Sequence, residues 1–209
     1  METSPSLISL GMQRPHITTL VFATHNANKA REVQQLLGPT FEIKTLTDIG
    51  CHEEITEDAD TLPGNARIKA RHVVEHYGLD CFADDTGLLV DALAGAPGVH
   101  TARYAGPNAT ADDNMDKLLS ALDGVADRSA RFVTVFCVIR EGQEVFIEGV
   151  CEGTIATEKA GGQGFGYDPV FIPKGHGTTF SEMTSPEKNA ISHRGKAVRS
   201  MVDALLERS

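Results

Sequence analysis

The chain has 209 residues, of which 41% are hydrophobic and 23% charged, and its formal net charge at pH 7 is −10. This composition is typical of a soluble globular protein, and the acidic balance argues against binding to a nucleic-acid polymer, which requires a basic surface. No apolar run approaches the roughly 20 residues of a membrane span, so we expect no membrane partner.

The cysteines and the first residues indicate the cell compartment and the extent of the domain. The four cysteines are scattered and form no C-x-x-C pair, which predicts a reduced, cytoplasmic protein without structural zinc. Residues 1–16 carry no signal-peptide pattern, and we expect them to form a disordered N-terminal extension, with Met12 as an alternative start. Residues 17–209 are then expected to form a single domain.

The first predicted strand leads into a helix. The run Thr18–Thr24 is rich in β-branched and aromatic residues, which predicts a strand, and an amphipathic helix follows and ends at Gly38. A helix N-terminus offers free N–H groups and can bind phosphate, and Lys29 would add a full charge. The alternative is that Asn26 or Asn28 only caps the helix and that the lysine is solvated.

A second strand, Phe41–Leu46, precedes the next predicted helix, which is capped by Thr61 and runs to about Tyr77. Asn65 and Lys69 are four residues apart, so they share one face of this helix, away from its apolar stripe. A lysine beside a small polar residue can reach a ligand there. The alternative is a lysine that faces solvent.

The segment Cys81–Gly87 is the strongest candidate for a chemical site. Its apolar start predicts the end of a buried strand, and Gly87 permits a turn directly after it. Adjacent strand residues point to opposite faces, so Asp84 and Asp85 are expected to have different roles unless the chain turns between them. Ligands of open α/β sheets bind where strands end, and carboxylates there can hold Mg²⁺. The alternative is a turn in which the aspartates only cap backbone amides.

The next part of the chain contains a long loop, a helix and a hairpin. Residues 95–107 are rich in glycine and proline, and loops of this length are usually either functional or disordered. Thr110 caps a helix that ends at Gly124. Residues 131–151 predict a long β-hairpin, which gives the sheet antiparallel character, and residues 154–157 a further short strand.

The last part of the chain contains a glycine-rich loop and a terminal helix. Residues 161–169 combine four glycines with Phe165 and Tyr167. Glycine is costly in chain entropy, so this composition indicates close backbone approach to a ligand, with the two rings as stacking surfaces. The alternative is a flexible surface loop. Ser185 is expected to cap the first turn of the C-terminal helical region, because Pro186 follows it.

Six stretches, taken together and in this order, resemble the Ham1/RdgB family of inosine/xanthosine triphosphate pyrophosphatases. They are residues 23–29, 65–70, 83–88, 95–99, 165–169 and 187–195. The resemblance extends over about residues 20–206. It implies an α/β fold with a long mixed central sheet flanked by helices, in two lobes with the active site in the cleft between them. It also implies hydrolysis of ITP, dITP and XTP to the monophosphate and pyrophosphate, dependence on Mg²⁺, and a homodimer.

The resemblance also assigns roles to single residues. Asp85, Lys69 and Glu57 are expected to act in catalysis, and the metal ligands are expected to be Asp85, Glu57 and Asp84. The residues expected to contact the substrate are Thr24, Asn26, Lys29 and Thr86 near the phosphates, Phe165, Gly166, Tyr167 and Asp168 at the nucleoside, and Lys188, His193 and Arg194 at the base.

These roles lead to a hypothesis for the chemistry. Water attacks at the α–β linkage, one carboxylate with a raised pKa acts as base, and Lys29 and Lys69 stabilise the leaving pyrophosphate. Hypoxanthine and xanthine carry an O6 acceptor where adenine carries an amino donor, so a donor such as Arg194 would select them. Phe165 would stack on the base.

Two other functions remain open at this point. A pyrophosphatase of the Maf type is similar in fold and acts on other nucleotides. A nucleotide-binding sensor would bind without turnover, although the carboxylates at positions 57, 84 and 85 argue against it because binding alone needs no water-activating cluster.

Overall fold

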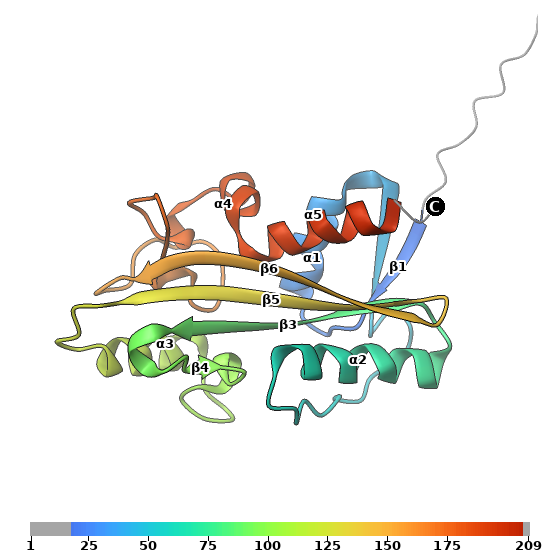
Figure 1. Ribbon diagram of the computed structural model, residues 1–209, viewed down its shortest axis with the longest axis horizontal. Coiled ribbons are helices and arrows are strands. Elements are labelled where there is room, and N and C mark those ends of the chain that lie inside the picture. Colours follow the sequence, from blue (N-terminus) through green and yellow to red (C-terminus); the bar gives the residue numbers. More distant parts are fainter. Residues whose placement is uncertain (1–17, 207–209) are drawn as a thin grey trace, which may run out of the picture.

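The structure, a computed structural model, describes residues 18–206, so the extension predicted for residues 1–16 and the domain boundary at residue 17 lie outside it. Within the described range the chain forms a seven-stranded mixed sheet with helices on both faces (Figure 1). The predicted α/β fold class, with a long mixed sheet flanked by helices, is confirmed.

The strands follow the order β2-β1-β3-β5-β6-β7, and β4 pairs with β3 beside this path. β1 is parallel to β2 and β3, and the other pairs are antiparallel. The strands are β1 Thr18–Phe22, β2 Phe41–Thr45, β3 Cys81–Val90, β4 Pro97–Gly98, β5 Ser129–Arg140, β6 Gln143–Ile155 and β7 Phe171–Pro173. The α-helices are α1 Ala27–Leu37, α2 Leu62–Tyr77, α3 Ala111–Ala121, α4 Ser185–Ile191 and α5 His193–Leu206.

Alternating strand residues divide between two core clusters on opposite faces of the sheet. Phe22 and Phe82 pack with α1 and α5 on one face, and their rings stack with centroids 4.5 Å apart. Val21 and Cys81, their neighbours in sequence, pack with α2 on the other face. Figure 1 shows α1 and α5 above the sheet and α2 below it. Each fully buried phenylalanine contributes about 1.5–3 kcal/mol of stability, so these rings fix which face of β1 and β3 meets which helix.

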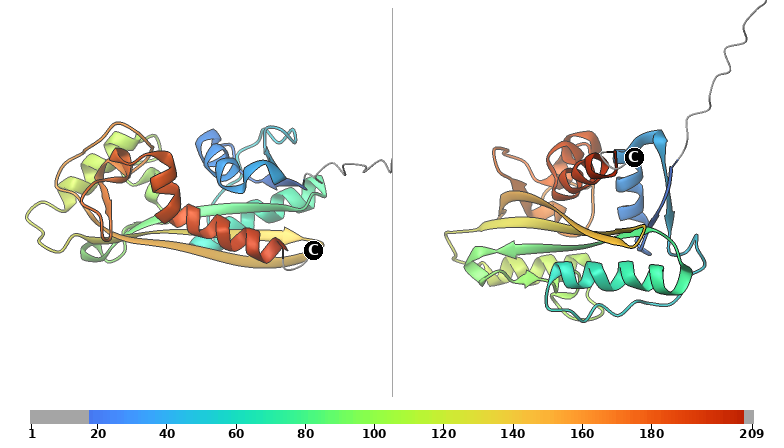
Figure 2. Two further views of the ribbon diagram at one scale, coloured as in Figure 1. Left: turned by 90° about the horizontal axis from the view of Figure 1, so that it is seen from above. Right: turned by 45° about the vertical axis from the view of Figure 1, so that its right-hand side comes forward.

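A third core cluster lies at the opposite end of the sheet, where Leu88, Leu118 and Phe171 join β3, α3 and β7. Seen from above, α3 and α1 lie at opposite ends of the long β5–β6 hairpin (Figure 2). The clusters at the two ends correspond to the two lobes implied by the resemblance. The polar segment Asp84–Thr86 of β3 lies between them.

The expectation that a strand ends near Ala83 and turns at Gly87 is wrong. β3 continues through the aspartates, because all ten of its residues pair with β5, from Cys81 opposite Ile139 to Val90 opposite Ala130. Gly87 serves the sheet differently, since a Cβ at this position would lie 3.0 Å from the carbonyl oxygen of Gly98 in β4. The glycine thus permits close approach of two strands.

Three local expectations also need correction. Residues 154 and 155 belong to β6, because the hairpin pairing extends to Ser129 opposite Thr154. Thr184, rather than Ser185, caps α4 and forms a capping box with Glu187. The predicted caps Thr61 and Thr110 are confirmed, each by a side-chain bond to a backbone amide in the first turn.

Two further expectations concern the membrane and the cysteines. Among the described residues, no helix has the length and apolar content needed to cross a membrane. All four cysteines of the chain are free thiols and are buried.

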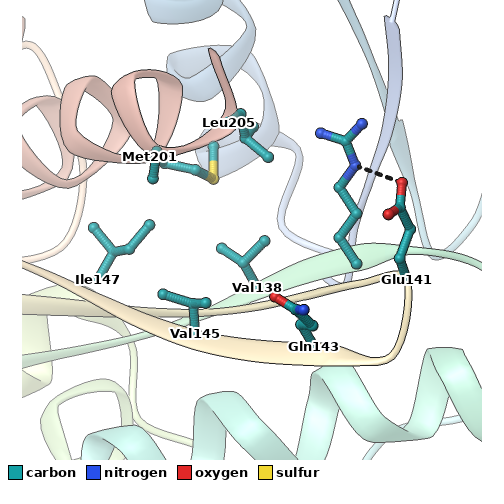
Figure 3. A pocket seen from close by; sticks show the side chains of 9 residues that line it. Val138, Glu141, Gln143, Val145, Ile147, Met201 and Leu205 are labelled. Carbon is teal, nitrogen blue, oxygen red and sulfur yellow. Dashed lines mark ion pairs between the residues drawn. The ribbon is translucent and has the colours of Figure 1, made fainter. Parts of the chain in front are cut away.

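Two of the cavities formed by the described residues are relevant to ligand binding. One, of about 420 Å³, lies between α5 and the β5–β6 hairpin and has largely apolar walls that include Val138, Ile147 and Met201 (Figure 3). Its charged side chains, Arg140 and Glu141, pair with each other at 3.7 Å. Another, of about 320 Å³, is lined by most of the predicted site residues.

Candidate active site

The candidate active site lies along one edge of β3. β1 pairs with β3 only at Cys81 and Phe82, and β4 pairs with it only at Leu88 and Leu89. Between these points, within residues 18–206, β3 has β5 on one side and no strand on the other. The cavity opens at this free edge, and all the predicted site residues except Thr24 and Asp84 line it.

The turn from β1 to α1 forms the first wall. The Asn26 side chain accepts hydrogen bonds from the backbone N–H groups of Asn28 and Lys29 at 3.0 and 3.1 Å, so Asn26 does cap α1. The second part of that alternative, a solvated Lys29, is wrong, because this lysine pairs with Asp84. Thr24 is buried, and its hydroxyl accepts the Asn26 N–H at 3.1 Å. The cap holds the start of α1 in place and directs Lys29 toward β3.

Asp84 lies between two cations. Its side chain is fully buried, and its oxygens lie 3.0 Å from Lys29 Nζ and 3.5 Å from Arg194 Nη2. The Thr86 hydroxyl donates to it at 3.2 Å. Burial raises the pKa of Asp84, but the charges of Lys29 and Arg194 outweigh burial and hold this pKa well below its usual range. Asp84 is therefore a counter-ion shared by Lys29 and Arg194.

Asp85 points to the opposite face of β3, so the predicted division between the two aspartates is confirmed. Its carboxylate accepts a hydrogen bond from Asn65 Nδ2 at 3.0 Å and from the Thr86 N–H at 2.9 Å. Burial raises the pKa of Asp85, and the nearby charge of Glu57 acts in the same direction, while Lys69 opposes the rise. This carboxylate is both exposed to the cavity and disposed to take up a proton.

The alternative interpretation, in which Lys69 faces solvent, is wrong. Lys69 and Asn65 are 8% and 1% exposed, because residues 51–61, here called the acidic loop, cover this face of α2. Lys69 Nζ lies 2.8 Å from Glu57 Oε2, and Asn65 Oδ1 accepts the Ala59 N–H at 3.0 Å. The acidic loop thus brings Glu57 into the cavity beside Lys69.

A second ion-pair group forms the far wall. Lys188 Nζ lies 2.9 Å from Glu32 Oε1 and 2.8 Å from Asp168 Oδ2, and Glu32 also pairs with Arg194. Burial raises the pKa of Glu32, but Arg194 and Lys188 outweigh burial and lower it. Sequence reasoning missed Glu32. The available signal was its position three residues after Lys29, which places both side chains on one face of α1.

The glycine-rich loop is built around Asp168. Its carboxylate accepts the Phe165 N–H at 2.8 Å, and a Cβ at Gly164, where φ is +83°, would come within 2.2 Å of it. Lys188 Nζ lies 4.8 Å from the centre of the Phe165 ring. The Tyr167 side chain is 4% exposed and packs in the core, so Phe165 is the ring of this loop that remains available for stacking.

His193 and Arg194 complete the cavity. The His193 ring stacks on Phe132, with centroids 4.5 Å apart, and burial lowers the pKa of this histidine well below its ordinary value of 6.5. Within the described residues, the buried side-chain polar atoms without a hydrogen-bond partner are His193 Nδ1 and Arg194 Nε. Buried polar atoms are normally paired, so these two mark where a ligand would supply partners.

Comparisons with known proteins identify the family of this chain. The model of the Ham1 family matches residues 20–204. A dITP/XTP pyrophosphatase of Porphyromonas gingivalis is 54% identical over 188 residues, covering 90% of this chain and 97% of that protein. A dITP/XTP pyrophosphatase of Christiangramia forsetii is 52% identical over 186 residues, covering 89% and 98%. The solved structure of a HAM1 protein from Coxiella burnetii matches with a TM-score of 0.83 and 40% identity, covering 91% of this chain and 99% of that one. The chain therefore belongs to the Ham1 family.

Proposed function

We propose that this protein hydrolyses deaminated purine nucleoside triphosphates, namely ITP, dITP and XTP, to the nucleoside monophosphate and pyrophosphate. The names of the similar proteins support this proposal. The observation that carries it is the cavity at the free edge of β3, where the half-buried Lys29 and the buried Lys69 meet the carboxylates Asp85 and Glu57. Two cations and two carboxylates in one cavity suit a polyanion and the water that attacks it.

The lysine end of the cavity would bind the triphosphate. Burial lowers the pKa of Lys29, although the adjacent Asp84 opposes this shift. The Asp84 carboxylate, 3.0 Å from Lys29 Nζ, provides a counter-ion for the ammonium group. Lys69 is held in place by Glu57. Fixed cations in a partly dehydrated cavity stabilise developing negative charge strongly because they need no reorganisation during the reaction. Lys29 and Lys69 would therefore stabilise the departing pyrophosphate.

The donor set beside these lysines fits Mg²⁺. Asp85 and Glu57 both offer carboxylate oxygens to the cavity, and hard cations prefer such ligands. Their mutual repulsion contributes to the raised pKa of Asp85, and a cation between them would relieve it. When bound, Mg²⁺ would neutralise phosphate charge and orient substrate. We assign Asp84 a different role, because its oxygens already face Lys29, Arg194 and Thr86.

Asp85 is our candidate for the general base. A raised pKa brings a carboxylate closer to the proton affinity that water activation requires. Asn65 and the Thr86 N–H fix the orientation of its two oxygens. The proton removed from the attacking water would pass to this carboxylate, while the bond between the α-phosphorus and the bridging oxygen breaks.

The other end of the cavity would recognise the base. Arg194 Nε is a buried donor without a partner, and it could pair with the O6 acceptor of hypoxanthine or xanthine. Adenine would bring an amino donor against it and leave both groups unpaired, at a cost of about 1–3 kcal/mol each. Phe165, with Lys188 above its ring, offers a stacking surface.

We further propose a cytoplasmic homodimer, which rests on the resemblance to the family and on the four free cysteines. Light scattering from the purified chain measures the assembly directly. A monomer at all concentrations would reject the dimer without affecting the proposed reaction.

The experiment that tests the function is pyrophosphate release from ITP, XTP, GTP, ATP and dTTP, with and without Mg²⁺. We expect Mg²⁺-dependent release from ITP and XTP and little from ATP. A preference for dTTP would favour a Maf-type pyrophosphatase. Binding of ITP without release would favour a sensor.

A further inference from the structure

We propose that Cys51, Glu53 and His72 form a second metal site, for a thiophilic divalent cation such as Zn²⁺, apart from the nucleotide cavity. One ligand atom from each of the three lies within 4.8 Å of the others. Cys51 Sγ lies 3.8 Å from His72 Nε2, and that nitrogen lies 3.0 Å from Glu53 Oε1. None of the three lines the nucleotide cavity.

Two of the three spacings are close to the corresponding edges of a tetrahedral zinc site. Zinc lies about 2.3 Å from sulfur, 2.0–2.1 Å from nitrogen and 2.0–2.2 Å from oxygen. At the tetrahedral angle these lengths give a sulfur–nitrogen edge of about 3.6 Å and a nitrogen–oxygen edge of about 3.4 Å. The observed 3.8 and 3.0 Å differ from these edges by a few tenths of an ångström, which rotations of the Glu53 and His72 side chains can supply.

The donor types select the metal. A thiolate, an imidazole and a carboxylate together suit zinc and its relatives, whereas Mg²⁺ prefers oxygen ligands. Cys51 is fully buried, while the Glu53 side chain is 53% exposed, so the site opens to solvent and water can complete the tetrahedron. The His76 ring stacks on His72 at 4.3 Å and limits the orientations of that ligand.

The position of this cluster connects it to the acidic loop. Asn65, Lys69 and His72 follow one another on a single face of α2, at spacings of four and three residues. The first two fasten the loop through the Ala59 N–H and the Glu57 carboxylate, and His72 fastens its beginning. A bound cation would join the first residues of the loop to α2, and would thereby restrain the segment that presents Glu57 to the nucleotide cavity.

Sequence reasoning predicted no structural zinc because it searched for paired cysteines. Here the ligands come from a loop and from a helix about 20 residues later, and the cysteine stands alone. The three side chains meet only because the acidic loop folds back along α2. Without that contact, the sequence pattern Cys-x-Glu does not indicate a metal site.

The test is a titration of the full chain with Co²⁺, in excess Mg²⁺ to occupy oxygen-only sites. A thiolate–cobalt charge-transfer band reports a metal bound to Cys51, independently of any enzymatic activity. We expect the band to saturate at a single equivalent and to disappear when Zn²⁺ is added. We expect Zn²⁺ also to slow proteolytic cleavage within residues 51–61.

Variants assign the band to the cluster. Cys51→Ala should abolish it, and His72→Gln should weaken metal binding by more than about 10-fold, the least that loss of even an outer partner usually costs. His52→Ala is the matched control, an exposed histidine next to Cys51 that lies outside the cluster, and it should bind like the unmodified chain. Circular dichroism confirms that each variant is folded. No thiolate band in the unmodified chain, or an unchanged band in folded His72→Gln, would overturn the proposal.

Discussion

Replacing Asp84 with asparagine removes a negative charge that pairs with both Lys29 and Arg194. Breaking a buried ion pair by removal of one partner costs about 3–5 kcal/mol, because the other charge stays buried without compensation. Asp84 is fully buried and the Lys29 side chain is 18% exposed, so the full range applies. Typical domains have only about 5–15 kcal/mol of net stability, and Asp84→Asn should therefore be severely destabilised while keeping the shape of the side chain.

The assay is urea denaturation followed by circular dichroism, because the chain contains no tryptophan. Asp203→Asn, at an exposed position of α5, is the matched control and should change the free energy of unfolding by no more than about 0.5 kcal/mol. The double variant Lys29→Met/Asp84→Asn should lose less than the sum of the two single losses, by about 0.5–3 kcal/mol. Additive losses would refute the reasoning, because they would show that the two charges do not interact in the folded protein.

Three further predictions concern the cavity. Asp85→Asn should lower kcat for pyrophosphate release by about 10²–10⁴-fold. In the unmodified enzyme, kcat/KM should fall at low pH as Asp85 is protonated, and this fall should begin at a higher pH than for an ordinary aspartate because burial raises the pKa of Asp85. A small loss of kcat in the variant, with the same fall of kcat/KM at low pH, would reject Asp85 as the base. Phe165→Ala should raise KM for ITP by about 10–100-fold through loss of stacking. The control Phe146→Ala, at an exposed position, should leave KM unchanged. A KM for Phe165→Ala equal to that of the unmodified enzyme would exclude stacking. The low pKa of His193 means that the folded chain does not bind the proton that the unfolded chain takes up; the free energy of unfolding should therefore fall below about pH 6.5, by up to about 1.4 kcal/mol per pH unit. His193→Gln should flatten this slope and the exposed His100→Gln should keep it, as denaturation at several pH values will show.

Local sequence signals predicted much of this site because local physics determines those parts. Asn26 caps α1 through bonds to residues two and three positions later, and such contacts can be inferred from residue type. The helical spacing of Asn65 and Lys69 placed both on one face, and the structure confirms that they share it. The alternation of strand residues also separated Asp84 from Asp85.

The remaining features depend on contacts between distant residues. β3 continues through two charged residues because β5 pairs along its whole length, and no pattern within β3 reports that partner. Glu32 pairs with Arg194 across 162 residues of sequence. A run of acidic residues such as 53–60 is usually solvated, but packing along α2 turns Glu57 inward, where it pairs with Lys69. In each case the local sequence preference predicted a different arrangement, and contacts between residues distant in sequence determined the structure instead.

The most direct test of the proposed reaction is the identity of the products formed from ITP in the presence of Mg²⁺. Separation by ion-exchange chromatography distinguishes the two possible cleavages of the triphosphate. The proposal predicts IMP and pyrophosphate in equal amounts, with their formation slowed together in Asp85→Asn. Formation of IDP and inorganic phosphate would contradict it, because the water would then attack at the terminal phosphorus.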